Sequence, residues 1–153
     1  MKRLHISFFV LALAALVASC CPCRKAAKTS HTSLLGTEWS LVQMAGRNIT
    51  EDFGAEDCPR LVLSDDGNFG GYGGCNSMGG SYKMTPYDNS AQRNIAGKIT
   101  FGDAFSTKRM CPNDRLEMEY LKALSECDSY AIEGSKLLLS HKGTLTLVFE
   151  AKK

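Results

Sequence analysis

Glycine is concentrated in one stretch of the chain, and this concentration limits how that part can fold. Residues 70–82, GGYGGCNSMGGSY, contain six of the fourteen glycines in thirteen positions. Glycine loses more conformational freedom on folding than any other residue, so such a run needs a structural reason. A phosphate-binding loop, a metal or redox site, and a sharply bent strand are the three candidates.

A nucleotide-binding loop needs a helix directly after its glycines. Gly79 and Gly80 lead instead into SYKMTP, which is not helical. The pattern therefore predicts two strands within 69–84 that bend or bulge around Cys75 and Asn76, because glycine permits close backbone approach in a curled sheet. Asn76 also tolerates a left-handed turn conformation.

The N-terminal residues are typical of a secretory signal. Two basic residues precede the apolar run ISFFVLALAALVA (6–18), which is too short for a comfortable membrane span. Small residues and then Cys20 follow, so the junction resembles the lipobox of bacterial lipoproteins. We expect a signal peptide over 1–19, lipid on Cys20 with a tether over 20–33, and one folded domain over 34–153. An ordinary cleaved signal followed by a chance cysteine is the alternative.

The residues after Cys20 bear on the destination of the lipoprotein. The segment CPCRKAAKTSHTS (21–33) contains no acidic residue. In many lipoproteins of Gram-negative bacteria, acidic residues at that place redirect sorting. Their absence favours the outer membrane, with the domain facing the periplasm.

The charge balance does not indicate a nucleic-acid partner. The chain has 18 Lys and Arg against 16 Asp and Glu. Two of the basic residues and none of the acidic ones lie in 1–19, which leaves 16 of each and a net charge near zero. A basic surface is the usual sign of nucleic-acid or anionic-membrane binding. We therefore expect a membrane partner through the N-terminal lipid and no nucleic acid.

The rest of the domain has the pattern of an antiparallel sheet with a helix. Strands are predicted at 37–42, 60–64 and 98–101, with polar loops at 45–57 and 85–97. A hairpin is predicted at the C-terminus, where LLLS leads through HKG into a run that alternates apolar and polar residues. No parallel βαβ repeat is visible. We expect an α+β fold in which a curved antiparallel β-sheet, a partial barrel, carries one α-helix.

That helix is marked by its start and by its apolar face. Asp114 is a suitable cap, and Glu117 three residues later completes an acidic version of the capping box. An apolar face then recurs at helical spacing and comprises Leu116, Tyr120, Leu121, Leu124 and Cys127.

Several motifs, taken in order, resemble one known family. They comprise Trp39; then Gly74, Cys75, Asn76, Gly80 and Tyr82; then Thr107, Met110 and Cys111. The folded part resembles the META domain family, which includes the HslJ heat-shock lipoproteins. One departure is Lys108-Arg109, where small or apolar residues are more usual. The resemblance implies a compact fold without an established catalytic activity, in envelope proteins linked to stress response, antibiotic tolerance or secretion.

Four of the seven cysteines lie in the domain, and an envelope location permits disulfides. We expect Cys75 to pair with Cys111, because the motifs that contain them should lie on neighbouring strands. Cys58 with Cys127 then follows by elimination. Buried thiols that form no disulfide are the alternative.

Other sites are weakly indicated. Cys21 and Cys23, with His31 nearby, lack a partner pair at zinc spacing, so no metal or cofactor is expected. Nothing in the spacing supports a catalytic Cys75–His141 pair.

We expect a non-catalytic binding or structural module with an envelope protein as its partner. The loops 45–57 and 85–97 are the candidate contacts, with Phe53, Tyr87 and Arg93 as the residues of the kind that interfaces favour. A small thiol-dependent enzyme or redox protein using Cys75 or Cys111 is the alternative.

Overall fold

The computed structural model describes residues 32–53, 57–87, 96–110 and 114–152. These residues form nine strands and two helices, which in chain order are β1 (Trp39–Met44), β2 (Arg47–Asn48), α1 (Thr50–Phe53), β3 (Arg60–Leu63), β4 (Asn68–Tyr72), β5 (Ser77–Pro86), β6 (Ala96–Ser106), α2 (Asp114–Glu126), β7 (Ser129–Glu133), β8 (Lys136–His141) and β9 (Thr144–Ala151). In this described part of the chain, neither helix is long and apolar enough to cross a membrane.

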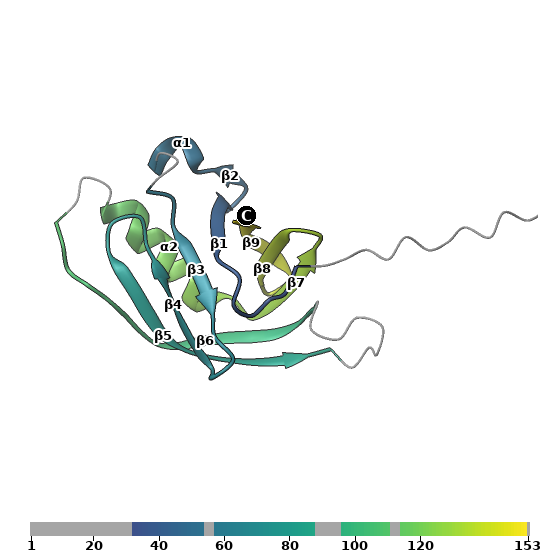
Figure 1. The fold of residues 1–153 in the computed structure, drawn as a ribbon. Coiled ribbons are helices and arrows are strands. Elements are labelled where there is room, and N and C mark those ends of the chain that lie inside the picture. The colour runs from purple at the N-terminus through teal and green to yellow at the C-terminus, as the bar shows by residue number, and fades with distance from the viewer. Residues whose placement is uncertain (1–31, 54–56, 88–95, 111–113, 153) are drawn as a thin grey trace, which may run out of the picture.

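The sheet closes on itself, so the expected partial barrel with one helix is wrong. Strands β3 to β9 follow one another as antiparallel neighbours, and β1 pairs with β3 on one edge and β9 on the other. The result is a closed eight-stranded barrel with β2 as an extra strand beside β1 and α1 as a second, short helix (Figure 1). The alternation of apolar and polar residues near the C-terminus predicts strand β9 and its hairpin partner β8. It does not predict that the other edge of β9 pairs with β1.

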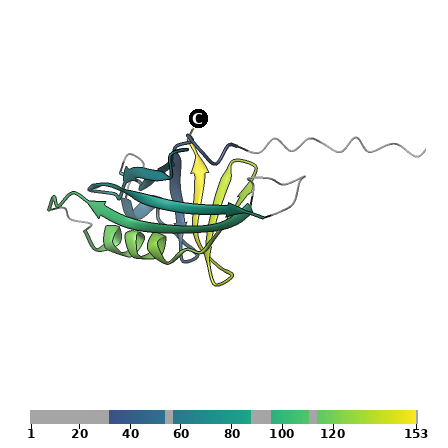
Figure 2. The same ribbon diagram turned by 90° about the horizontal axis from the view of Figure 1, so that it is seen from below.

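Helix α2 packs where strand β6 continues beyond its short pairing with β7. Strand β6 pairs with β7 only through Ala96–Lys98, whereas its pairing with β5 continues to Ser106. Figure 2 shows α2 running alongside the long β5–β6 ribbon. Its apolar face enters the core through Tyr120 and Leu124, and the Tyr120 ring meets Phe149 of β9 edge to face at 6.3 Å. The predicted helix and its buried face are therefore confirmed.

Bulges decide which residues of the strands at the seam are buried. In β1 the register shifts between Leu41 and Gln43, so Trp39, Leu41 and Met44 all face the core. A second shift in the β8–β9 hairpin leaves Leu145 46% exposed, although the alternation places it on the buried face with Leu147. The hairpin itself is as predicted.

Other predicted elements differ in extent. The expected strand 98–101 belongs to the much longer β6, and the expected loop 45–57 contains β2 and α1. Strand β7 was not anticipated.

The glycine stretch is a place of close backbone approach, as the sequence predicts. It forms β4, a turn and β5, which pair from Asn68–Ser81 to Tyr72–Ser77. A Cβ on Gly71 would lie 2.0 Å from the carbonyl oxygen of Arg60 on β3, and one on Gly80 would lie 2.6 Å from the Phe69 ring. Glycine at these positions lets the strands and the core residues meet.

The core is continuous and lies within the barrel. It includes Leu34 near the start of the described residues and Phe149 near their end. Every strand pairing lies between Leu34 and Ala151. A chain that begins at residue 30 therefore contains every contact of the described fold.

Gly71 and its neighbour Gly70 provide a matched test of this close approach. We expect Gly71→Ala to lower the free energy of unfolding by at least about 2 kcal/mol, because backbone must move to admit the methyl group. Gly70→Ala should change it by about 0.5 kcal/mol or less, because the nearest atom would be 3.9 Å away. Urea unfolding of both variants measures the difference, and equal stabilities would contradict this account of the glycines.

Candidate functional site

Asn76, in the turn between β4 and β5, connects three parts of the chain. Its side-chain oxygen accepts hydrogen bonds from Thr107 Oγ1 at 2.9 Å and from the backbone N–H of Arg109 at 2.7 Å. Its amide nitrogen donates to Glu117 Oε2 on α2 at 2.9 Å and to the carbonyl oxygen of Arg109 at 3.4 Å. The residue is 6% exposed. It thus fixes the segment after β6 and the first turn of α2 against the β4–β5 turn.

Glu117 does not complete the predicted capping box. Its side chain turns inward, is 3% exposed, and accepts the Asn76 hydrogen bond with one oxygen. The other oxygen, Oε1, has no hydrogen-bond partner among the residues that the structure describes. Gly73 leaves the room for this carboxylate, since a Cβ there would lie 2.9 Å from Oε1. The carboxylate faces inward because the β4–β5 turn offers both space and a donor.

A pocket of about 320 Å³ opens beside this carboxylate. Ten of the described residues line it: Asn76, Ser106, Thr107, Lys108, Arg109, Met110, Asp114, Glu117, Met118 and Leu121. Met110 is fully exposed and Met118 is 62% exposed. The lining of the pocket therefore combines polar and charged side chains with the apolar side chains of Met110, Met118 and Leu121.

The motif residues divide into a structural group and a group at this pocket. Trp39 is fully buried, and its indole N–H donates to the Leu34 carbonyl oxygen at 3.1 Å. Tyr82 donates its hydroxyl hydrogen to the carbonyl oxygen of Ser64, and Gly80 admits the Phe69 ring.

The second group lies at or beside the pocket. Gly74 and Cys75 precede Asn76 in the turn, and Thr107 and Met110 line the pocket. Gly74 has φ +106°, and a Cβ there would lie 2.2 Å from the Phe53 ring. Lys108-Arg109, the departure from the family pattern, forms part of the pocket wall.

Two of the four cysteines of the domain do not form the expected disulfide. Cys58 and Cys127 are both in the thiol form, so the Cys58–Cys127 disulfide is wrong. Each sulfur is buried in the core, where a thiol behaves as a small apolar group. Cys127 donates to the Ala123 carbonyl oxygen at 3.2 Å, and burial raises the pKa of its thiol to about 12. Burial likewise raises the pKa of Cys58.

Cys75 is 4% exposed, and its sulfur lies 3.8 Å from the carbonyl oxygen of Arg109 and 3.5 Å from the Asn76 amide nitrogen. Cys111 lies outside the described residues, so the Cys75–Cys111 pairing stays a prediction.

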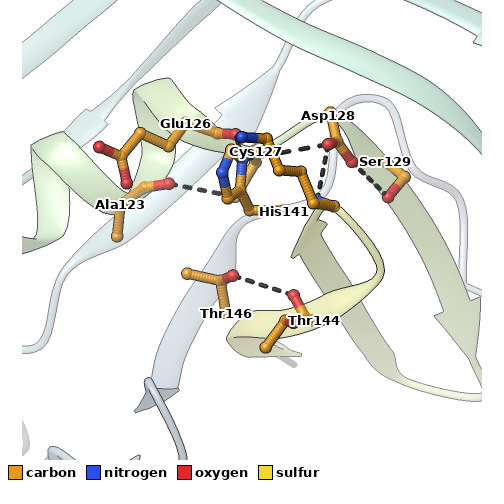
Figure 3. A network of polar contacts seen from close by, with 9 residues as sticks. Ala123, Glu126, Cys127, Asp128, Ser129, His141, Thr144 and Thr146 are labelled. Atoms are coloured by element: carbon orange, nitrogen blue, oxygen red, sulfur yellow. Dashed lines mark hydrogen bonds and ion pairs between the residues drawn. The ribbon is translucent and has the colours of Figure 1, made fainter.

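His141 belongs to a different polar network, at the other end of α2 (Figure 3). Its Nδ1 contacts the Glu126 carbonyl oxygen and lies 3.9 Å from Asp128 Oδ2. The backbone N–H of Lys142 donates to Asp128 Oδ2 at 2.7 Å, and this hydrogen bond is the main reason why the pKa of Asp128 is lowered. Glu126 lies about 13 Å along the helix axis from Glu117. The structure therefore does not bring His141 to Cys75.

The predicted contact residues of the loops lie in different surroundings. Phe53 is 5% exposed and packs against the β4–β5 turn, so it is a core residue. Tyr87 is 50% exposed. Arg93 lies outside the described residues, as do Cys20, the predicted lipidation site, and the predicted tether residues Cys21, Cys23 and His31. Within the described part, no group of three or more His, Cys, Asp or Glu side chains is placed to hold a metal ion.

Comparison with known proteins places this barrel in a family. The family model described as META domain matches residues 32–153. The chain belongs to the META domain family. Among curated proteins there is no match.

Solved structures share the META fold at low sequence identity. The NMR structure of a protein from Burkholderia xenovorans is 26% identical, with a TM-score of 0.57 over 78% of this chain and 84% of that one. The crystal structure of a DUF4847 family protein from Bacteroides vulgatus ATCC 8482 is 16% identical, with a TM-score of 0.53 over 78% and 94%. The second likeness concerns the fold alone.

Asn76 is the residue on which we expect the geometry of this META-domain pocket to depend. Asn76→Ala should lower the free energy of unfolding by about 3 kcal/mol, because it leaves the Arg109 N–H and the Glu117 carboxylate without their partner. Asn68→Ala at the exposed start of β4 is the control and should cost about 0.5 kcal/mol. Thermal or urea unfolding measures both, and a cost for Asn76→Ala no larger than that of the control would show that the hydrogen bonds do not hold the site.

Proposed function

We propose that this META-domain protein is a lipid-anchored, non-catalytic binding module of the cell envelope. It is anchored through Cys20 in the outer membrane of a Gram-negative bacterium, faces the periplasm, and holds a partner whose binding supports resistance to envelope stress or antibiotics. The observation that carries the proposal is the Glu117 carboxylate, which is buried beside a pocket and keeps one oxygen without a hydrogen-bond partner among the described residues.

The surroundings of the pocket support binding over covalent catalysis. A nucleophile needs a base within hydrogen-bond reach and a third group that orients the base. Cys75 instead lies against Asn76 and Arg109, and the side chain of Asn76 is occupied by structural hydrogen bonds. A thiol-dependent reaction at Cys75 would need a base other than Asn76 and Arg109.

A disulfide between Cys75 and Cys111 is part of the proposal. The sulfur of Cys75 lies 3.8 Å from the carbonyl oxygen of Arg109, two residues before Cys111 in the sequence. Cys58 and Cys127 are the thiols of the described residues, and Cys75 is not among them. A disulfide that closes a loop of about 35 residues adds roughly 3 to 4 kcal/mol to stability in the chain-entropy model.

Intact mass spectrometry of the full-length protein, expressed in a Gram-negative host and extracted from membranes without reductant, tests both modifications. We expect an acylated N-terminus at Cys20, a mass two hydrogens below that of the reduced form, and a peptide map that links Cys75 to Cys111. Cys20→Ser should leave the protein uncleaved and without lipid. An unacylated mature N-terminus would refute the anchor, and a Cys75 thiol that labels rapidly in the folded protein would favour thiol chemistry instead.

The binding role is tested in cells that lack the gene and are challenged with heat or antibiotics. We expect wild-type protein and Glu119→Gln to restore survival, and Cys20→Ser and Glu117→Gln to fail, at equal protein levels. Glu119 is a matched control because it lies on the same helix and its carboxylate faces Arg115 and Arg47 outside the pocket. Full rescue by Glu117→Gln would refute a role for the pocket, and full rescue by Cys20→Ser would refute a role for the anchor.

A further inference from the structure

An exposed aromatic side chain lies across a glycine on the outer face of the barrel. Phe105 of β6 is 68% exposed and pairs with Gly79 of β5. A Cβ on Gly79 would lie 2.7 Å from Cζ of Phe105, so the ring extends over the glycine. An aromatic side chain that covers a glycine on the neighbouring strand supports a sheet. That role uses one side of the ring, and most of the residue remains in contact with solvent.

The surface next to this ring carries few side chains. Gly79 pairs with Gly70 of β4, which pairs in turn with Val62 of β3. This row lies on the outer face, because the residues on either side of Val62 are buried in the core and side chains alternate between the two faces of a strand. A Cβ on Gly70 would have no atom closer than 3.9 Å. An open, flat strip of backbone therefore adjoins the Phe105 ring.

Tyr72 lies at the far end of this strip. It follows Gly70 by two residues on β4, so both face outward. Tyr72 is half-buried, and the Arg60 guanidinium lies over its ring, 5.2 Å from the centroid. This cation–π contact restrains the ring. Because β3 to β6 are neighbours in the sheet, this face presents two aromatic residues, on β6 and on β4, with glycines between them (Figure 1).

A bulge in β6 holds a carboxylate near Phe105. Between the pairs Gly79–Phe105 and Ser81–Gly102, β6 has one more residue than β5. Asp103 lies in this bulge with φ +47°, a left-handed conformation that residues other than glycine seldom adopt. Bulges re-aim side chains. The Ser81 hydroxyl donates to Asp103 Oδ2 at 3.1 Å, and Ser81 follows Gly79 on the same face by two residues, or about 7 Å.

We propose that this face of the barrel binds a β-1,4-linked glycan chain, with one sugar ring stacked on Phe105 and its hydroxyls donating to the Asp103 carboxylate. The chain continues over Gly70 toward Tyr72. The C–H bonds of a pyranose ring form an apolar face with hydroxyls around its edge, which matches an exposed aromatic ring with a carboxylate at its side. Rings of β-1,4-linked glucose or N-acetylglucosamine carry only equatorial substituents, so the chain is flat and fits a surface without side chains.

Other occupants fit this face less well. A stable protein interface covers about 800 Å² on each partner around an apolar core. Of the large apolar side chains that are exposed in the described part of the chain, only Phe105 lies within β3 to β6. An anion would meet the Asp103 carboxylate. A cation would meet Lys83, which is exposed and follows Ser81 by two residues on the same face.

Titrations followed by two-dimensional NMR of a chain that begins at residue 30 test the ligand class. The probes are cellotetraose, chitotetraose, methyl β-glucoside, sorbitol as a polyol without a ring, and tetramethylammonium as a cation without hydroxyls. We expect at least one tetrasaccharide to bind about tenfold more tightly than methyl β-glucoside, because a chain also reaches the second aromatic residue. The perturbed amides should include those of Gly70, Gly79 and Phe105, and sorbitol should perturb none of them.

Matched variants assign the binding to this face. Phe105→Ala should weaken tetrasaccharide binding about tenfold or more. Tyr87→Ala should not change it, because Tyr87 is an exposed aromatic residue just beyond the other end of the β5–β6 ribbon. Asp103→Asn should weaken binding about threefold, because a neutral acceptor replaces a charged one. Asparagine also tolerates a positive φ, so this variant carries the test if Phe105→Ala does not fold.

The outcomes are distinct. Tetrasaccharide binding that weakens in Phe105→Ala and not in Tyr87→Ala supports the inference. Failure of both tetrasaccharides to bind, perturbations away from β4 to β6, or binding no tighter than that of methyl β-glucoside would overturn it. Perturbation of the same amides by tetramethylammonium alone would make the face a cation site and would also overturn it. Phe105 does not line the pocket beside Glu117, so none of these results decides the proposed function.

Discussion

The side chain of Asn76 is the point on which the geometry of the site depends. A side-chain amide carries both an acceptor oxygen and two donor hydrogens, so a single residue can serve two partners of opposite character. The oxygen of Asn76 holds Thr107 and the backbone of Arg109, and its nitrogen holds Glu117 on α2. The turn between β4 and β5, the segment after β6 and helix α2 are thereby fixed together.

The sequence predicts the parts of this arrangement that follow from local rules. The glycines of 70–82, without a helix after them, indicate two closely approaching strands, and β4 and β5 form them with Gly71 against β3. The spacing of Tyr120 and Leu124 predicts the buried face of α2. The family motifs also bring Asn76 and Thr107 to attention, although the motif gives no reason why they are needed.

What the sequence does not predict depends on contacts between distant segments. Closure of the barrel needs β1 and β9, which are more than 100 residues apart, and the apolar alternation of β9 marks a buried face without naming a partner. Glu117 has the spacing of a capping residue, and only the space above Gly73 and the donor on Asn76 turn it inward. The pairing of Cys58 with Cys127 was expected only because these two cysteines remained after Cys75 and Cys111 were paired. That reasoning is wrong because a cysteine buried in the core can remain a thiol.

The charge of Glu117 is not required by the fold. Glutamine would keep an oxygen for Asn76 and would avoid burying a carboxylate, which costs several kcal/mol per ion in a protein interior. The N-terminal turn of α2 stabilises a negative charge by about 0.3 to 1 kcal/mol, and by about 2 kcal/mol in favourable buried geometries, so it offsets only part of that cost. A chain that retains the carboxylate beside a pocket gives up stability at this position.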